Sequence, residues 1–254
     1  MGESNARVKV VFLGSKLVGF ECFSFLIANR TKLNLEIVGA LTNNNNVFGN
    51  FDVKALAEEN NIPVFDNLEA LPEVDYLISV QYHEILKRNH IAKAKKLAIN
   101  LHMAPLPEYR GCNQFSYAII NGDAEFGTTL HRLEEGIDSG AIIAERRFEI
   151  PKDCMVNELY NLTVQKSCVL FVEEIENIVH GNYTLTPQED LFDQRKHSLH
   201  YRKEINDLKR IDLDWPAEKI KRHIRATYMP GFEPPYAIVN GGRINFEIKR
   251  GQEK

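Results

Sequence analysis

The stretch that decides the fold is residues 7–29, RVKVVFLGSKLVGFECFSFLIAN. Residues 7–13 form an apolar, β-branched run, which is typical of a buried strand. Gly14 and Ser15 end that run, and residues 18–29 then carry apolar side chains at helical spacing. A strand, a tight turn and a helix in this order predict the opening of an α/β sheet. The turn lacks a complete G-x-G-x-x-G pattern, so it gives little support to a dinucleotide cofactor.

The same alternation continues along the chain. Residues 35–41 and 74–80 are further apolar strands, and residues 53–60 form a short helix between them. Residues 128–133 and 141–150 also have strand character, and residues 156–180 have the spacing of a long helix that backs the sheet. We therefore predict an α/β fold with a doubly wound, mostly parallel, Rossmann-like sheet.

The C-terminal part differs in composition. From residue 183 onward the chain is more charged and irregular, with an amphipathic helix at residues 217–226. Two short strands, residues 236–239 and 243–248, flank Asn240-Gly241-Gly242, which is typical of a β-hairpin turn. We predict a larger domain at residues 1–200 and a small C-terminal subdomain of helix and hairpin at residues 201–254.

Composition excludes several classes of protein. The 254 residues are 44% hydrophobic, enough for a substantial core, and the net charge of -4 does not favour a nucleic-acid partner. No apolar run reaches the length of a membrane span, and the polar N-terminus is unlike a secretory signal, so we expect a cytoplasmic protein without membrane contact. The four cysteines form no C-x-x-C pair, and His197 and His200 have no third ligand nearby in the sequence, so we predict no metal site.

Three polar residues carry the candidate chemistry. Asn100 and His102 end an apolar run, and their spacing of two puts both side chains on one face of an extended strand. Pro105 and Pro107 then prevent a helix, and Asp138 lies in a glycine-bounded turn between two strand-like runs. We expect an amide donor, an acid/base group and a carboxylate to converge at one edge of the sheet.

This pattern resembles the folate-dependent formyltransferases. Asn-Leu-His at residues 100–102, Tyr-Arg-Gly at 109–111, Gly-Thr-Thr-x-His at 127–131 and Gly-Ile-Asp-Ser-Gly at 136–140 follow in family order and spacing. The segment Met-Ala-Pro-Leu-Pro at 103–107 looks like the subgroup that acts on nucleotide-linked amino sugars. It is most similar to members acting on dTDP-linked 3-amino-3,6-dideoxyhexoses for surface polysaccharide. The resemblance covers roughly residues 7–248.

The resemblance implies a role for each member of this trio. Formyl transfer develops negative charge on an oxygen, which Asn100 would stabilise by donating a hydrogen bond. His102 would move the proton from the attacking amine to the leaving nitrogen, and Asp138 would orient the imidazole. The family's co-substrate is 10-formyltetrahydrofolate. The positions implied to contact it are Gln81, Tyr82, His83, Glu134, Glu135, Gly136 and Ile137.

The acceptor side follows from the same resemblance. A nucleotide sugar needs basic groups for its diphosphate and an aromatic ring for its base. The candidates are Arg202, Lys203, Tyr228, Phe232 and Tyr236. The resemblance also implies a homodimer through the hairpin at residues 236–248.

Other functions stay open. A methionyl-tRNA formyltransferase needs a full C-terminal tRNA-binding domain, and the 54 residues after His200 are short for one. Formylation of glycinamide ribonucleotide is a weaker alternative, because that group lacks a comparable hairpin. A folate- or sugar-nucleotide-binding module without activity is the alternative from another class.

Overall fold

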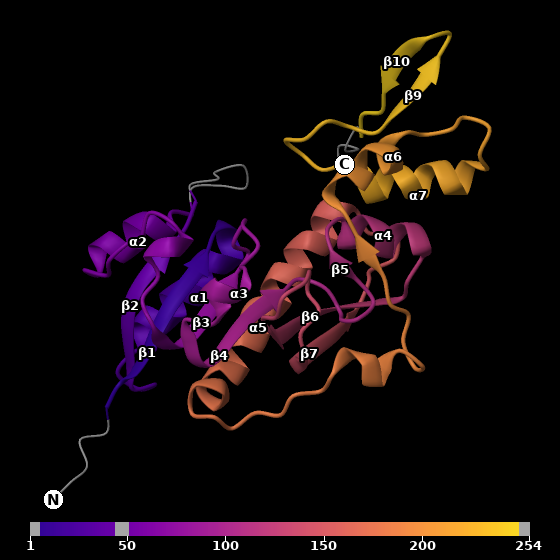
Figure 1. The fold of residues 1–254 in the computed structure, drawn as a ribbon. Coiled ribbons are helices and arrows are strands. Elements are labelled where there is room, and N and C mark those ends of the chain that lie inside the picture. Colours follow the sequence, from indigo (N-terminus) through magenta and orange to yellow (C-terminus); the bar gives the residue numbers. More distant parts are fainter. Residues whose placement is uncertain (1–5, 44–50, 249–254) are drawn as a thin grey trace, which may run out of the picture.

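A computed structural model describes residues 6–43 and 51–248, and its centre is a six-stranded sheet (Figure 1). The strand order is β2-β1-β3-β4-β6-β7. The first four of these strands run parallel, whereas β6 is antiparallel to β4 and β7 is antiparallel to β6. The bounds are β1 Val8–Gly14, β2 Leu35–Leu41, β3 Val74–Val80, β4 Ala94–His102, β6 Glu125–Arg132 and β7 Ile142–Glu149. The predicted mostly parallel sheet is confirmed.

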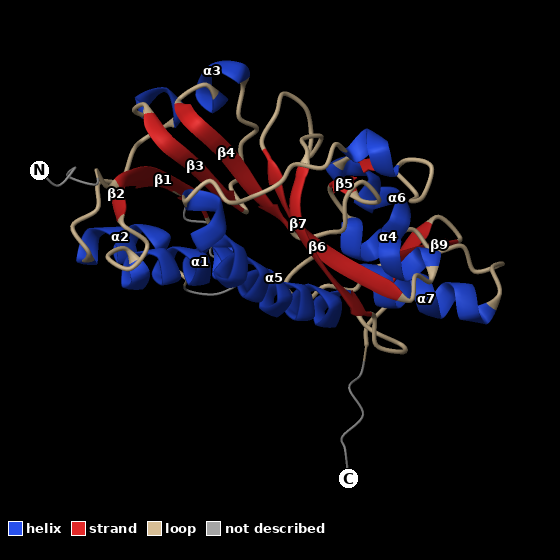
Figure 2. Ribbon diagram, turned by 90° about the horizontal axis from the view of Figure 1, so that it is seen from below, coloured by secondary structure: helices blue, strands red, loops and turns tan. Residues whose placement is uncertain are grey.

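Helices cover both faces of this sheet (Figure 2). On one face lie α1 (Lys16–Asn29), α2 (Val53–Glu59) and the long α5 (Val156–Val179), and α3 (Arg88–Ile91) lies on the other. Successive strand residues point to opposite faces. Phe12 of β1 accordingly packs with the α1 and α5 side chains, whereas Val11 and Leu13 belong to a separate apolar cluster that includes Leu68 of the short helix η2 (Leu68–Ala70).

Some boundaries differ from the predicted ones. Helix α1 begins at Lys16, two residues before the predicted start, directly after the extended residue Ser15. Strand β6 begins at Glu125 rather than at residue 128, because pairing with β7 extends it to the Glu125–Glu149 pair. Helix α4 (Gln114–Asn121) was not predicted; it is followed by Gly122, whose φ of 70° is a left-handed conformation that suits glycine.

The C-terminal part contains the predicted helix and hairpin. Helix α7 (Ala217–Thr227) contacts α4, and α6 (Ile205–Lys209) contacts α7. The hairpin consists of β9 (Tyr236–Val239) and β10 (Gly242–Asn245), so its second strand ends earlier than the predicted residue 248. The division at residue 200 stays a prediction. The remaining elements are β5 (Arg110–Gly111), η3 (Gln188–Leu191), β8 (Leu199–His200) and η4 (Arg202–Glu204).

In the part of the chain that the structure describes, none of the helices combines the length and the apolar character that a bilayer crossing requires.

Candidate active site

Strand β4 delivers the first two site residues. Leu97, Ile99 and Leu101 face the core beneath α1 and α5, whereas Ala98 belongs to the cluster on the opposite face. By strand alternation, Asn100 and His102 point to the same face as Ala98. The predicted shared face is therefore confirmed, and the His102 side chain is almost fully buried there.

The loop after β4 is tied to the turn that contains Asp138. Arg110 Nε donates to the carbonyl oxygen of Ile137 at 2.9 Å, and the Gly111 N–H donates to Asp138 Oδ2 at 2.9 Å. Gly111 has a φ of +86°, and a Cβ there would lie 2.2 Å from the His200 carbonyl oxygen where β5 pairs with β8. Glycine is thus the residue that allows this backbone N–H to reach the carboxylate.

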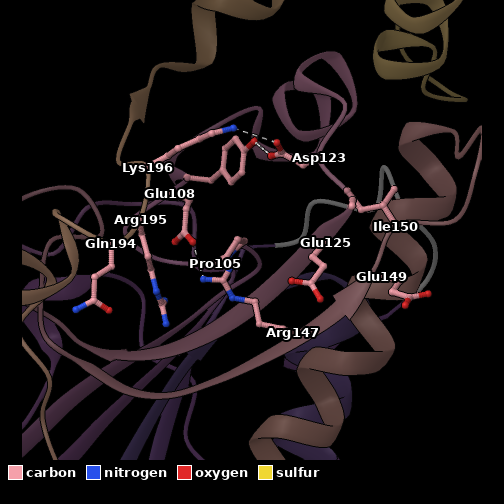
Figure 3. Close-up of a pocket in the computed structure, with 12 residues that line it drawn as sticks. Pro105, Glu108, Asp123, Glu125, Arg147, Glu149, Ile150, Gln194, Arg195 and Lys196 are labelled. Carbon is pink, nitrogen blue, oxygen red and sulfur yellow. Dashed lines mark hydrogen bonds and ion pairs between the residues drawn. The ribbon is translucent and has the colours of Figure 1, made fainter.

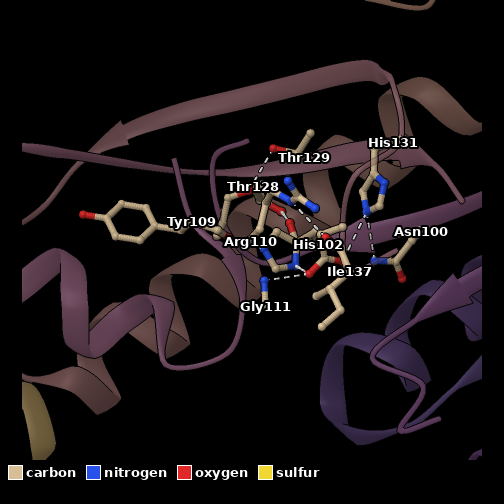
Figure 4. A network of polar contacts seen from close by, with 12 residues as sticks. Asn100, His102, Tyr109, Arg110, Gly111, Thr128, Thr129, His131 and Ile137 are labelled. Carbon is tan, nitrogen blue, oxygen red and sulfur yellow. Dashed lines mark hydrogen bonds and ion pairs between the residues drawn. The ribbon is translucent and has the colours of Figure 1, made fainter. Parts of the chain in front are cut away.

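The carboxylate of Asp138 lies between two imidazoles. Asp138 Oδ2 is 3.5 Å from His102 Nδ1, and Oδ1 is 3.6 Å from His131 Nε2. Gln188 Nε2 donates to the carbonyl oxygens of both Asp138 and Gly140 at 2.8 Å, which fixes the turn. Asn100 Nδ2 is 3.1 Å from His131 Nε2 (Figure 4). The structure therefore brings Asn100, His102 and Asp138 together.

The two nitrogens of His102 have different environments. Nε2 is 2.7 Å from the Tyr109 carbonyl oxygen, which can only accept, so Nε2 carries a hydrogen. Nδ1 faces Asp138 Oδ2 at the longer distance. With its hydrogen on Nε2, the neutral ring has its lone pair on Nδ1, the nitrogen next to the carboxylate.

Asp138 is ionised in the folded protein. Burial of the carboxyl raises its pKa, but the charge of His102 and the hydrogen bond from the Gly111 N–H hold the pKa well below its usual range. A permanent negative charge therefore faces Nδ1 of His102.

Sequence reasoning gave no role to three residues of β6 that shape this site. Thr128 Oγ1 donates to the His102 carbonyl oxygen at 3.0 Å, and Thr129 Oγ1 donates to the Ala104 carbonyl oxygen at 2.8 Å. His131 pairs directly with Asn100 across the two strands. The Gly-Thr-Thr-x-His motif marked these positions, but their partners depend on the antiparallel register of β4 and β6.

The residues predicted to contact folate lie in two places. Gln81 follows β3; its carbonyl oxygen accepts from Ser15 Oγ at 2.6 Å and its Oε1 accepts from Lys16 Nζ at 3.1 Å. Tyr82 and His83 pack edge to face beside it. Glu134 and Glu135 line a cavity of about 410 Å³ together with Arg88, Ile91 and Leu133. Gly136 and Ile137 continue from there into the Asp138 turn.

Of the residues predicted to bind the acceptor, Arg202 lies close to the first turn of α1. Burial and the charge of Arg202 lower the pKa of Lys16, a cation that sequence reasoning did not single out. Lys203 is exposed. Tyr228 follows α7, Phe232 is exposed, and Tyr236 of the hairpin lies against Arg243, all in the segment beyond α6 and α7 in Figure 1. Their roles stay predictions.

A second cavity, of about 730 Å³, lies elsewhere (Figure 3). Its charged lining is largely paired: Arg147 contacts Glu108 at 2.7 Å, and Lys196 lies 3.5 Å from Asp123. Asn100, His102 and Asp138 do not line it. The cavity and the site share Tyr109, whose side of the loop lines the cavity and whose carbonyl oxygen accepts from His102.

No group of three or more His, Cys, Asp and Glu side chains within residues 6–43 and 51–248 is arranged to hold a metal ion. The two histidines considered for such a site have other contacts: His197 stacks on Phe192, and His200 stacks on Tyr117.

One known family matches the part of the chain that carries the three site residues. The formyl transferase family model matches residues 30–175, more than half of the chain and the segment that carries Asn100, His102 and Asp138. The chain belongs to the formyl transferase family. The predicted family membership is thereby confirmed.

The relatives that this chain resembles differ in the substrate that their names give. A GDP-perosamine N-formyltransferase of Brucella melitensis biotype 1 is 30% identical over 167 residues, which are 66% of this chain and 62% of that protein. A methionyl-tRNA formyltransferase of Clostridium acetobutylicum is 32% identical over 142 residues, 52% of this chain and 46% of that protein. Both matches span less than two thirds of the relative's length.

Solved structures agree with the fold. WlaRD, a sugar 3N-formyl transferase crystallised with dTDP and 5-N-formyl-THF, has a TM-score of 0.77 at 24% identity, covering 93% of this chain and 84% of that one. The N-formyltransferase of Helicobacter canadensis, in complex with folinic acid and dTDP-3-aminofucose, has the same TM-score and identity, covering 93% and 86%.

The buried charge of Asp138 predicts how stability depends on pH. Its depressed pKa stabilises the fold above the unfolded-state pKa of about 3.9, and this contribution is lost as the pH falls below that value. Asp138→Asn should therefore unfold at lower temperature than the wild type at pH 7, and the difference should narrow below about pH 4. Thermal unfolding from pH 7 to pH 3, with the exposed Asp66→Asn as control, measures this. A difference that stays constant over this range would contradict it.

Proposed function

We propose that this chain is an N-formyltransferase that transfers a formyl group from 10-formyltetrahydrofolate to the amino group of a nucleotide-linked amino sugar. The observation that carries the proposal is the convergence of an amide, a buried imidazole and an ionised carboxylate in a member of the formyl transferase family. Two solved structures of the same fold contain a formyl-folate together with dTDP or a dTDP-sugar, which supports this choice of ligands.

Each of the three side chains fits one requirement of the reaction. The folate supplies a formyl group bound to nitrogen, and the amine of the acceptor forms a new C–N bond as the folate nitrogen leaves. Asn100 donates a hydrogen bond to the formyl oxygen as negative charge develops; removing such a donor typically raises the barrier by about 3–4 kcal/mol. His102 Nδ1 takes the proton of the amine and returns it to the leaving nitrogen, while the Asp138 carboxylate stabilises the protonated ring.

The cavity lined by Leu133, Glu134 and Glu135 is our candidate for the folate. It adjoins the Asp138 turn in the chain, and Leu133 and Ile91 offer apolar contact to a flat ring. The carboxylates of Glu134 and Glu135 pair with Arg132 and Arg88, and their remaining oxygen lone pairs would accept the hydrogen bonds that a pterin donates. Gln81, Tyr82 and His83 would line the approach from β3.

The acceptor is, in this proposal, a dTDP-linked 3-amino-3,6-dideoxyhexose. The cations Lys16 and Arg202 would hold the diphosphate, because they lie close enough for one to lower the pKa of the other. An aromatic ring among Tyr228, Phe232 and Tyr236 would stack on the base. The relative that acts on GDP-perosamine makes that sugar the alternative acceptor. We further propose that the enzyme is cytoplasmic and serves surface polysaccharide synthesis.

A panel of acceptors tests this function. The protein and 10-formyltetrahydrofolate would be incubated with dTDP-linked 3-amino-3,6-dideoxyhexoses, GDP-perosamine, glycinamide ribonucleotide and initiator methionyl-tRNA. We expect a mass gain of one formyl group on the dTDP-sugars, and none without folate or with His102→Asn. A mass gain on GDP-perosamine alone would make that sugar the acceptor in place of the dTDP-sugars. Formylation of the tRNA would contradict the proposal that the acceptor is a sugar. Binding of both ligands without transfer would favour a module that has lost activity.

We also propose that the hairpin forms a homodimer contact. Ile238 is 46% exposed and Ile244 is 52% exposed, one on each face of the hairpin. Apolar side chains this exposed on a two-stranded ribbon favour burial against a second copy.

Sedimentation of variants tests the dimer. Ile238→Glu puts a charge into the proposed contact and should give a monomer, because the carboxylate must lose its hydration when the contact closes. Val172→Glu on α5 is the matched control, since Val172 is 42% exposed but lies away from the hairpin; it should stay dimeric. A wild-type monomer, or an Ile238→Glu dimer as stable as the control, would refute the contact.

A further inference from the structure

His131 is the one imidazole of the site to which the proposed reaction gives no task. It lies on β6 directly opposite Asn100 of β4, so the two side chains share a face of the sheet. The ring is only 1% exposed, and it lies between Asn100 and Asp138. A fully buried polar ring at this place is available to act on its two neighbours.

The hydrogens of His131 follow from its partners. Nδ1 lies 2.9 Å from the Arg132 carbonyl oxygen, which can only accept, so Nδ1 carries the hydrogen. In the neutral ring Nε2 is then a bare acceptor, and it faces Asn100 Nδ2 at 3.1 Å. An amide nitrogen donates, so this contact is satisfied only when Asn100 turns its nitrogen, and not its oxygen, toward His131.

This contact selects one of two orientations for the Asn100 amide. In the reversed orientation Oδ1 would face the lone pair of His131 Nε2, close to the Asp138 carboxylate, and these groups repel one another. In the observed orientation one N–H is used by His131, and the second has no hydrogen-bond partner among the residues that the structure describes. Figure 4 shows the amide nitrogen turned toward His131 and the oxygen turned away.

We propose that His131 is a positioning residue that fixes the Asn100 amide, so that its second N–H points at the formyl oxygen in the transition state. The inference rests on the proposed function and adds to it the reason why Asn100 acts as a donor. A preorganised donor is effective because it needs no reorientation during the reaction. An amide free to reverse would present its oxygen to the developing negative charge for part of the time.

Two substitutions at residue 131 distinguish a ring that fixes the Asn100 amide from a ring that only fills space in the core. Glutamine can place a carbonyl oxygen near the Nε2 position and accept from Asn100, whereas asparagine reaches only the Nδ1 position and can bond only to the Arg132 carbonyl oxygen. We expect His131→Asn to lower kcat about 100-fold with both KM values nearly unchanged, and His131→Gln to recover most of that loss. His223→Asn, which changes another buried histidine on α7, is the control and should leave kcat unchanged.

A double-mutant cycle tests whether His131 affects kcat through Asn100. In the Asn100→Ala background the amide is absent, so His131→Asn should cost about threefold or less in kcat. Equal losses for the Gln and Asn variants, or the full loss persisting without Asn100, would overturn the proposal, because both results fit a ring that only fills space.

A third measurement does not depend on turnover. Nitrogen-15 NMR of histidine-labelled protein identifies which ring nitrogen of His131 carries the hydrogen, assigned by comparison with His131→Gln. We expect the hydrogen on Nδ1 and a bare Nε2, as the contacts with the Arg132 carbonyl oxygen and the Asn100 amide require. A hydrogen on Nε2 would overturn the proposal even if formyl transfer is confirmed. If the wild type transfers no formyl group, the proposed function fails, and this spectrum still decides whether His131 holds the amide.

Discussion

The arrangement of the whole site depends on the buried carboxylate of Asp138. It accepts the Gly111 N–H from the loop after β4, faces Nδ1 of His102 at the end of β4, and faces Nε2 of His131 on β6. Three separate segments of the chain thus meet at one charge. The depressed pKa keeps that charge in place, so the imidazole of His102 always has a counter-ion available when it becomes protonated.

The reversal of strand direction after β4 explains why these groups can meet. Because β6 runs antiparallel to β4, His131 lies opposite Asn100 and the strand leads directly into the Asp138 turn. Gly140 allows the return into β7, because a Cβ there would lie 1.9 Å from the Arg132 carbonyl oxygen. The parallel half of the sheet provides the frame, and its antiparallel half closes the site.

Local sequence patterns were sufficient to predict much of the fold and the three residues Asn100, His102 and Asp138. Strands β2, β3 and β9 were predicted to the residue, because apolar runs bounded by turn residues determine them. Asn100 and His102 were correctly put on one face by their spacing. The role of Gly111 and the partners of His131 were missed, because both depend on which strands pair and in which register, and α4 was missed because it packs mainly through tertiary contacts with α5 and α7.

The most direct test of this account is the kinetic effect of removing the charge of Asp138 while keeping its shape. Transfer of the formyl group from 10-formyltetrahydrofolate by Asp138→Asn would be measured at saturating concentrations of both substrates. The account predicts that kcat falls by orders of magnitude, because the protonated imidazole loses its counter-ion, while both KM values stay close to those of the wild type. A kcat near the wild-type value would contradict it.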